Sequence, residues 1–246
     1  MPILAVVLLV LDITMAFHAV KTGRFSPWFY VIIALPGVGA LAYVFMVLIP
    51  EYSQTYHGQK TRTRINRALD PDGIYRALKT EVEIANTIAN RAALAQECLV
   101  LGRYDEAWAQ YDTILGMHLG DEPEYMAGRA RAEFGQRRFA DARATLEELR
   151  RRWPEWQSGD SHLLYARTLE EGGHWSEAAD EYRAVSSYYA GAEPRVRLGL
   201  VLRKLGREGE ARGVLADVIR QMERAPRFAR ETQAEWIAMA HDALRA

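Results

Sequence analysis

The chain has 246 residues, of which 31 are basic and 32 acidic, and its formal net charge is −1 at pH 7. This balance excludes a protein that binds nucleic acid through overall positive charge, because such proteins carry a clear basic excess. The single cysteine, Cys98, excludes an intramolecular disulfide and a metal site built from several cysteines of one chain.

Two long apolar runs open the chain, residues 3–20 and 28–49, and Asp12 is the only acidic or basic residue in either. At about 1.5 Å per helical residue they would measure ~27 Å and ~33 Å. Both lengths match a bilayer hydrocarbon core of about 30 Å. The sequence therefore predicts a transmembrane helical hairpin over residues 1–50, with a short loop at Lys21–Pro27.

Basic residues set the predicted orientation of this hairpin. The loop carries Lys21 and Arg24, whereas four basic residues follow the second run in a linker over residues 51–72: Lys60, Arg62, Arg64 and Arg67. The positive-inside rule then predicts a multi-pass protein of the bacterial inner (cytoplasmic) membrane, with the rest of the chain in the cytoplasm. The same four side chains are also candidates to bind anionic lipid headgroups, and both interpretations remain open.

Helix-breaking residues lie at the centre of the second run, at the depth of Asp12 in the first. Because Pro36 has no N–H, the Ile32 carbonyl loses its helical partner. We predict that a neutral Asp12 donates a hydrogen bond to this carbonyl, while Gly37 and Gly39 let the helices approach closely. These residues would form a structural set inside the membrane; the alternative is an ionisable Asp12 that binds a proton or a partner.

The same region carries a resemblance, in the motifs Ser26-Pro27-Trp28, Leu35-Pro36, Gly39-Ala40-Leu41 and Tyr43. Residues 4–48 resemble the N-terminal membrane hairpin of phospholipase D-type cardiolipin synthases. Catalysis in that family uses two H-x-K-x-x-x-x-D motifs, and none of the six histidines here is followed two residues later by lysine. The resemblance therefore implies a membrane anchor without the enzyme activity.

After residue 87 the sequence repeats itself. Small residues recur in two sets with spacings of 35, 36 and 33 residues and a constant offset of 12, namely Ala95, Ala130, Ala166 and Gly199, then Ala107, Ala142, Ala178 and Ala211. A bulky residue precedes the second alanine as Tyr104, Phe139 and Trp175, and Glu208 replaces it in the fourth unit. Gly102, Gly173 and Gly206 mark turns between the sets.

Such a pattern predicts pairs of antiparallel helices that cross where both present small side chains. The stretch LGRYDEAWAQYDTIL (101–115) resembles the tetratricopeptide repeat (TPR), and the resemblance covers residues 88–221. We predict an all-α protein in which residues 73–246 form a TPR α-solenoid of about four helix pairs, with cap helices at Ile74–Ala85 and Phe228–Leu244. Because Glu208 departs from the pattern, we expect looser packing in the fourth pair.

The sequence contains none of the catalytic or nucleotide-binding motifs G-x-x-x-x-G-K-[ST], G-x-S-x-G or H-E-x-x-H, so we predict no enzyme activity, catalytic residue, cofactor or metal site. The resemblance to TPR proteins implies a curved inner wall that binds a peptide or helix of a partner protein. The candidates for this groove lie one residue past each small position and about one turn further along each first helix. They are Gln96, Leu99, Arg131, Phe134, Arg167, Glu170, Leu200 and Arg203.

These observations predict a membrane-anchored TPR scaffold or adaptor that binds partner proteins at the cytoplasmic face of the inner membrane. The alternative is a non-catalytic accessory subunit of a membrane phospholipid-synthesis enzyme, which the hairpin would contact within the membrane.

Overall fold

Every regular element that the structure describes is helical. The computed structural model describes residues 2–54 and 70–245, and the chain divides into two units, Met1–Ile74 and Tyr75–Ala246. The predicted all-α class is therefore confirmed. Four basic residues of the predicted linker, Lys60, Arg62, Arg64 and Arg67, lie outside the described residues.

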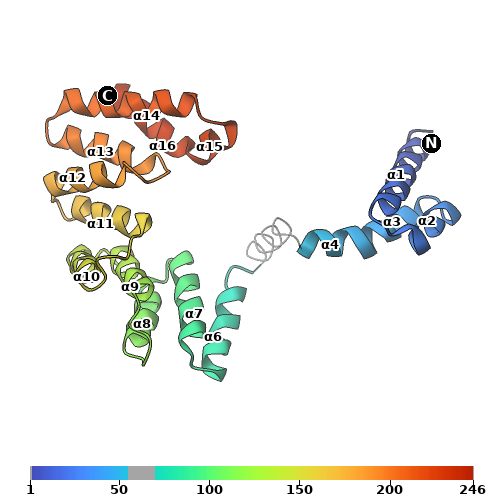
Figure 1. Ribbon diagram of the computed structural model, residues 1–246, viewed down its shortest axis with the longest axis horizontal. Coiled ribbons are helices and arrows are strands. Elements are labelled where there is room, and N and C mark those ends of the chain that lie inside the picture. The colour runs from blue at the N-terminus through green and yellow to red at the C-terminus, as the bar shows by residue number, and fades with distance from the viewer. Residues whose placement is uncertain (1, 55–69, 246) are drawn as a thin grey trace. The chain divides into compact units, whose positions relative to one another are not determined.

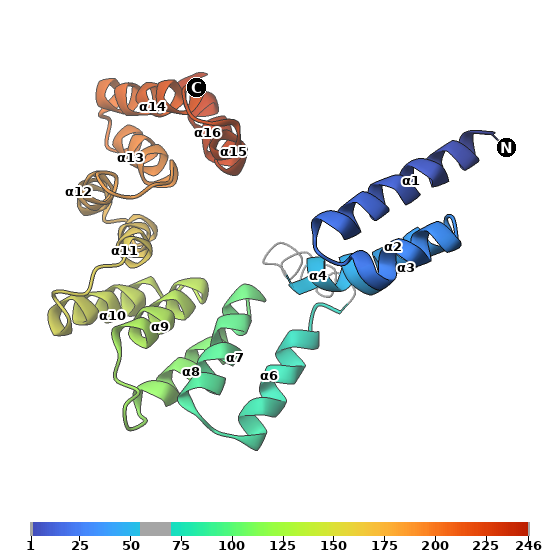
Figure 2. The same ribbon diagram turned by 45° about the vertical axis from the view of Figure 1, so that its right-hand side comes forward.

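The first unit begins with α1 (Pro2–Lys21), which lies beside α2 (Phe25–Ala34) and α3 (Val38–Tyr43) (Figure 2). A π-helical turn (Val44–Leu48) and α4 (Ile49–Gln54) follow. The core of this unit is small and consists of the buried residues Ala19, Ile32, Ala40 and Tyr43 with their neighbours. Many large apolar side chains of these helices are consequently exposed, among them Phe17, Phe45 and Met46.

The two predicted membrane spans are not found. Residues 28–49 do not form one helix, because α2 ends at Ala34 and α3 begins at Val38 after a left-handed Gly37 with φ of +78°. Within residues 2–54 and 70–245, no helix is both long enough and apolar enough to cross a membrane. The predicted location of the chain in a bacterial inner membrane, with its TPR domain in the cytoplasm, is therefore wrong.

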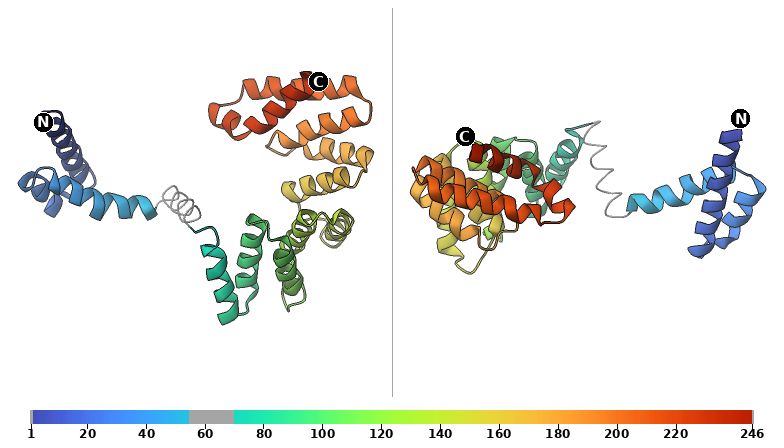
Figure 3. Two further views of the ribbon diagram at one scale, coloured as in Figure 1. Left: turned by 180° about the vertical axis from the view of Figure 1, so that it is seen from behind. Right: turned by 90° about the horizontal axis from the view of Figure 1, so that it is seen from above.

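The second unit is a stack of antiparallel helix pairs that follow one another along the chain (Figures 1 and 3). The pairs are α7 (Ile88–Val100) with α8 (Tyr104–Leu115), α9 (Pro123–Gly135) with α10 (Phe139–Arg152), α11 (Gly159–Glu171) with α12 (Trp175–Val185), and α13 (Glu193–Lys204) with α14 (Glu208–Glu223). Before them stands α6 (Gly73–Ile84), and after them α15 (Arg227–Thr232) and α16 (Ala234–Arg245). The predicted helical solenoid is confirmed.

The small residues of the repeat pattern lie where paired helices cross. All seven alanines of the two sets have 0% of their surface exposed: Ala95, Ala130, Ala166, Ala107, Ala142, Ala178 and Ala211. In the fourth pair, a Cβ added to Gly199 would come within 2.6 Å of Cγ of Leu215. Close crossing therefore depends on these positions, as the spacing predicts.

All four pairs use the same turn between their two helices. The second residue after the first helix has a left-handed backbone, with φ of +71° at Gly102, +61° at Arg137, +80° at Gly173 and +74° at Gly206. In each turn the next N–H bonds to the carbonyl five residues earlier, over 2.8 Å in the first pair and 2.9 Å in the others. This is the Schellman motif, which closes helices with glycine. Arg137 holds the glycine position in the second pair.

The fourth pair is packed as well as the others, so the looser packing expected there is not observed. Leu215 and Val218 on α14 have 0% of their surface exposed. Glu208 does not fill the place of a bulky side chain but forms ion pairs with Arg203 at 3.3 Å and with Arg212 at 3.2 Å.

Both ends of the stack are covered by helices. On the first pair, Tyr75 of α6 packs with Cys98 and Ala107 and donates a hydrogen bond to Glu106 over 2.5 Å. At the other end α15 and α16 divide at Gln233, whose side-chain oxygen accepts a hydrogen bond from the Ala192 N–H over 2.9 Å. The C-terminal cap is thus two helices, and not the single helix predicted over Phe228–Leu244.

Candidate functional site

A groove of about 550 Å³ opens on the first helices of three successive pairs, α7, α9 and α11. Five of the eight residues predicted for a partner-binding groove line it together: Gln96, Leu99, Arg131, Phe134 and Arg167. They meet because each follows the buried small residue of its helix by one position or by about one turn, and therefore faces away from the paired second helix. Val100, Tyr104, Gly135, Arg137, Phe139, Leu164 and Glu171 complete the lining.

The floor of the groove is apolar and partly aromatic. The rings of Phe134 and Phe139 lie 5.3 Å apart at 63°, an edge-to-face arrangement that fixes both side chains. Tyr104 of the first pair reaches the second because α9 has glycine there: a Cβ on Gly135 would come within 2.3 Å of the Tyr104 ring. The floor is therefore built by residues of adjacent pairs and not by a single helix.

The rim of the groove is positively charged, with Arg131, Arg137 and Arg167 against the single carboxylate of Glu171. The guanidinium carbon of Arg167 lies 4.9 Å from the centre of the Phe134 ring, and that of Arg137 lies 5.7 Å from the Phe139 ring. Such stacking holds an arginine in place without neutralising its charge.

The ion pairs of two rim arginines are long. Arg131 is 4.0 Å from Asp160, and Arg167 is 3.8 Å from Glu193, both beyond hydrogen-bonding distance. Glu193 itself accepts a hydrogen bond from Arg197 over 2.7 Å. Neither carboxylate therefore accepts a hydrogen bond from these two rim arginines.

The other three predicted groove residues are engaged elsewhere. Glu170 accepts hydrogen bonds from the Tyr182 hydroxyl over 2.5 Å and from Arg197 over 3.1 Å. Leu200 packs in the cluster that includes residues of α16, and Arg203 donates to the Ala243 carbonyl of α16 over 2.7 Å. The groove consequently ends before the fourth pair, where α16 covers α13.

Sequence reasoning missed Arg137 as a groove residue, and it treated Tyr104 and Phe139 only as packing residues. The signal for Arg137 was present in the repeat pattern, because the positions of Gly102, Gly173 and Gly206 predict a glycine at residue 137.

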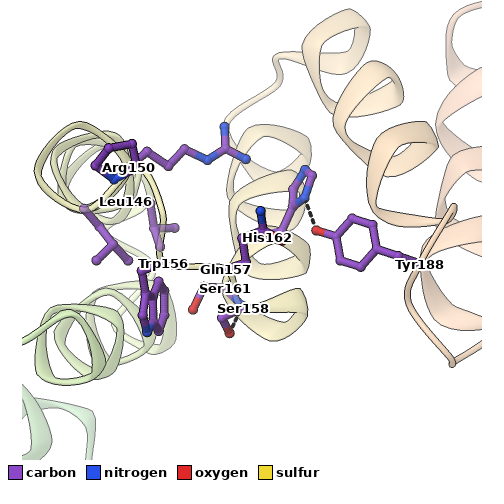
Figure 4. Close-up of a pocket in the computed structure, with 10 residues that line it drawn as sticks. Leu146, Arg150, Trp156, Gln157, Ser158, Ser161, His162 and Tyr188 are labelled. Atoms are coloured by element: carbon purple, nitrogen blue, oxygen red, sulfur yellow. Dashed lines mark hydrogen bonds between the residues drawn. The ribbon is translucent and has the colours of Figure 1, made fainter.

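A second cavity of about 330 Å³ lies between α10, the loop that follows it and the start of α11 (Figure 4). His162 points across it to the Tyr188 hydroxyl and hydrogen-bonds Glu181 through Nε2 over 2.5 Å. Arg150 also reaches Glu181, with two hydrogen bonds of 3.1 and 3.0 Å. The charged groups at this cavity are thus paired with one another, which favours a structural role as a junction between the second and third pairs.

In the first unit, Asp12 and the Pro36–Gly39 segment lie together as predicted, but the hydrogen bond that joins them differs from the predicted one. The Gly37 N–H donates to both carboxylate oxygens of Asp12 over 2.9 Å, so Asp12 is the acceptor and the contact requires no proton on it. The prediction had Asp12 donating to the Ile32 carbonyl. The break at Pro36 instead leaves the Gly37 N–H outside α2 and α3, and this donor needs a partner.

Gly39 permits a close approach to α2. A Cβ at this position would come within 2.4 Å of the Val31 carbonyl oxygen. A Cβ on Gly37 would meet the Leu8 side chain of α1 at 3.5 Å, which is ordinary contact. No helix among the described residues is long and apolar enough to cross a membrane. The prediction that these residues lie inside a membrane is therefore not supported.

The remaining candidates are clusters of possible metal ligands and the thiol of Cys98. In the described ranges, no group of three or more histidine, cysteine, aspartate and glutamate side chains is placed to hold a metal ion. Burial raises the pKa of the Cys98 thiol to about 11, and its surface is fully covered. A thiol in this state is a poor nucleophile at neutral pH.

Comparisons with known proteins concern the repeats. Residues 92–155 and 127–185 match the family model of the tetratricopeptide repeat. A crystal structure of a thermophilic TPR protein of Thermus thermophilus is similar, with a TM-score of 0.53 and 18% identity over 74% of this chain and 97% of that chain. MamA is similar with a TM-score of 0.52 and 15% identity, over 78% and 96% of the two chains.

No curated protein matches the sequence. Residues 92–185 are therefore similar in sequence to tetratricopeptide repeats, and the two solved structures are similar in fold to this chain over the parts that they cover. The resemblance of residues 4–48 to cardiolipin synthases is not found in these comparisons.

Proposed function

We propose that this protein is an interaction scaffold whose groove over α7, α9 and α11 binds an extended segment of a partner protein. The observation that carries the proposal is the groove itself: residues of three successive pairs supply one apolar floor and one cationic rim. Repeat solenoids use surfaces of this kind, which run across several repeats, to bind peptides.

The composition of the lining favours binding over catalysis. It contains no serine, cysteine, histidine or aspartate, and its single acidic residue is Glu171. Nucleophilic and general acid–base catalysis need such groups in pairs within hydrogen-bonding reach. The partly exposed side chains of Leu99 and Phe134 offer instead an apolar contact for a partner's side chain.

Site-specific photocrosslinking in the native cells tests this proposal. A photoreactive amino acid is placed at Leu99 in the groove and, as a control, at Arg220 on the exposed face of α14. We expect a discrete protein adduct from position 99, none from position 220, and a loss of roughly tenfold in the adduct when Arg131→Glu and Arg167→Glu are combined.

Circular dichroism and thermal melting of the double variant provide the control for folding. Both arginines are about one-third exposed and make only long ion pairs, so we expect the melting temperature to change little. Equal adducts from both positions, or an adduct that survives the charge reversals in a folded variant, would contradict binding at the groove.

A further inference from the structure

Arg137 holds a backbone conformation that the other three repeats give to glycine. Its N–H bonds to the Phe134 carbonyl over 2.9 Å, as the N–H of Gly206 bonds to the Arg203 carbonyl over 2.9 Å. The turn is therefore the same with arginine as with glycine. The second repeat differs only in the side chain it places there.

An arginine at this position is unfavourable for the backbone. A left-handed conformation brings Cβ close to the carbonyl oxygen of its own residue, and glycine avoids this contact. Space is not the reason for the glycines, because a Cβ at Gly173 or Gly206 would meet nothing within 4 Å. A residue kept in a disfavoured conformation points to a role of its side chain outside the fold.

The side chain of Arg137 has no ionic role within the described parts of the chain. It makes no ion pair there, and its guanidinium carbon lies 5.7 Å from the centre of the Phe139 ring of the groove. The adjacent Arg138 behaves differently, since it lies 3.9 Å from Glu133 and 3.6 Å from Asp141. One of two neighbouring arginines thus serves the protein's own ion pairs, while the other extends to the groove.

The charges of the groove identify the partner that fits it. Three arginines line it against one carboxylate, and between them lie Leu99, Phe134 and Phe139. Resting on the proposed function, we infer that the groove binds an acidic peptide segment that also carries large apolar side chains, and that Arg137 is a specificity-determining residue for its carboxylates. Opposite charge attracts such a segment, and the apolar floor holds its side chains.

Selection from a library of random peptides displayed on phage tests the inference on the full-length protein. We expect the enriched peptides to have an excess of aspartate and glutamate around at least one large apolar residue. Enriched peptides that are neutral or basic, yet compete for the groove, would overturn the acidic preference and leave the proposed function intact. Equal enrichment on the protein and on the Arg131→Glu, Arg167→Glu variant would count against the proposed function itself.

Arg137→Gly separates the role of this side chain from the fold. We expect the Kd for a selected acidic peptide to rise about three- to tenfold, while the melting temperature stays the same or rises by about 2 °C. Arg137→Lys keeps a cation and should retain most of the affinity. Gly206→Arg, the reverse exchange at a turn outside the groove, should lower the melting temperature by about 2–4 °C and leave the Kd unchanged.

An unchanged Kd in Arg137→Gly would remove Arg137 from the binding site. A lower melting temperature in that variant would show that the arginine stabilises the turn, and would equally overturn the inference.

Discussion

Glu181 joins three helices through its carboxylate. It accepts hydrogen bonds from Nε2 of His162 on α11 over 2.5 Å and from the Arg150 guanidinium of α10 over 3.1 and 3.0 Å, while belonging itself to α12. Burial alone would raise the pKa of this carboxyl, but the hydrogen bonds and the charge of Arg150 outweigh burial and lower the pKa to about 2. The ionised carboxylate is therefore the form that the fold stabilises.

This shift makes stability depend on pH in a defined direction. The pKa of Glu181 is lower in the folded than in the unfolded chain, so its contribution is complete above about pH 5 and is lost as the pH falls towards about 2. We expect Glu181→Gln to lower the free energy of unfolding at pH 7 by ~1–2 kcal/mol, since an amide cannot form the same ion pair with Arg150.

Thermal melting at a series of pH values checks this expectation. The difference in melting temperature between the two proteins should shrink steadily as the pH is lowered from about 5 towards about 2, where the carboxyl of the native protein becomes protonated. A difference that is the same at every pH would mean that the ionised carboxylate contributes nothing.

The helix pairs of the second unit were predictable because their signal is local and repeated. The alanines and Gly199 recur at nearly constant spacing, and each marks a crossing that the structure confirms. The second apolar run failed for the opposite reason: its hydropathy is uniform, and the decisive event is the backbone turn at Pro36 and Gly37. Mean hydropathy over a window does not register a single left-handed residue.

Prediction of the groove residues was also limited to what the local repeat pattern determines. Gln96, Arg131 and Arg167 could be placed from the period alone, because the repeat geometry determines where they point. Leu200 and Arg203 occupy equivalent positions, yet α16 packs over them. That contact joins residues about 40 positions apart outside the repeat pattern, so no spacing within the repeats predicts it.

Two glycines of the fourth pair allow the crossing of helices to be measured directly. A Cβ on Gly199 of α13 would lie 2.6 Å from Cγ of Leu215, whereas a Cβ on Gly213 of α14 would meet nothing within 4 Å. We expect Gly199→Ala to lower the free energy of unfolding by ~1–3 kcal/mol, because α13 and α14 must separate to admit the methyl group.

Gly213→Ala serves as the matched control. It should raise stability by ~0.5–1 kcal/mol, because alanine is the better helix residue and has open space there. Urea unfolding of both variants checks the pair of expectations. Equal effects of the two substitutions would show that the helices are not in close contact at Gly199.

Stability in a repeat solenoid is distributed along the stack, because each pair contacts only its neighbours and the caps close the ends. The C-terminal cap carries Trp236, Ile237 and Leu244, which pack against Val218 and Ile219 of the fourth pair. The groove residues lie on α7 to α11 and in the turns between them, and none of them belongs to the apolar cluster of these cap residues. Cap and groove are therefore expected to respond separately to a change at the C-terminal end.

Ending the chain at Ala225 should unravel the stack from that end. The deletion removes α15 and α16 and exposes apolar side chains of α13 and α14, so their amides should lose most of their protection from hydrogen exchange. The amides of α7 to α10 should keep theirs within about tenfold, because nearest-neighbour coupling fades along the repeats. Binding of a peptide selected on the groove should persist with a Kd within about threefold for the same reason. Uniform loss of protection from α7 to α14 would instead show that the second unit unfolds as one cooperative body, with the cap stabilising the groove as strongly as the last pair.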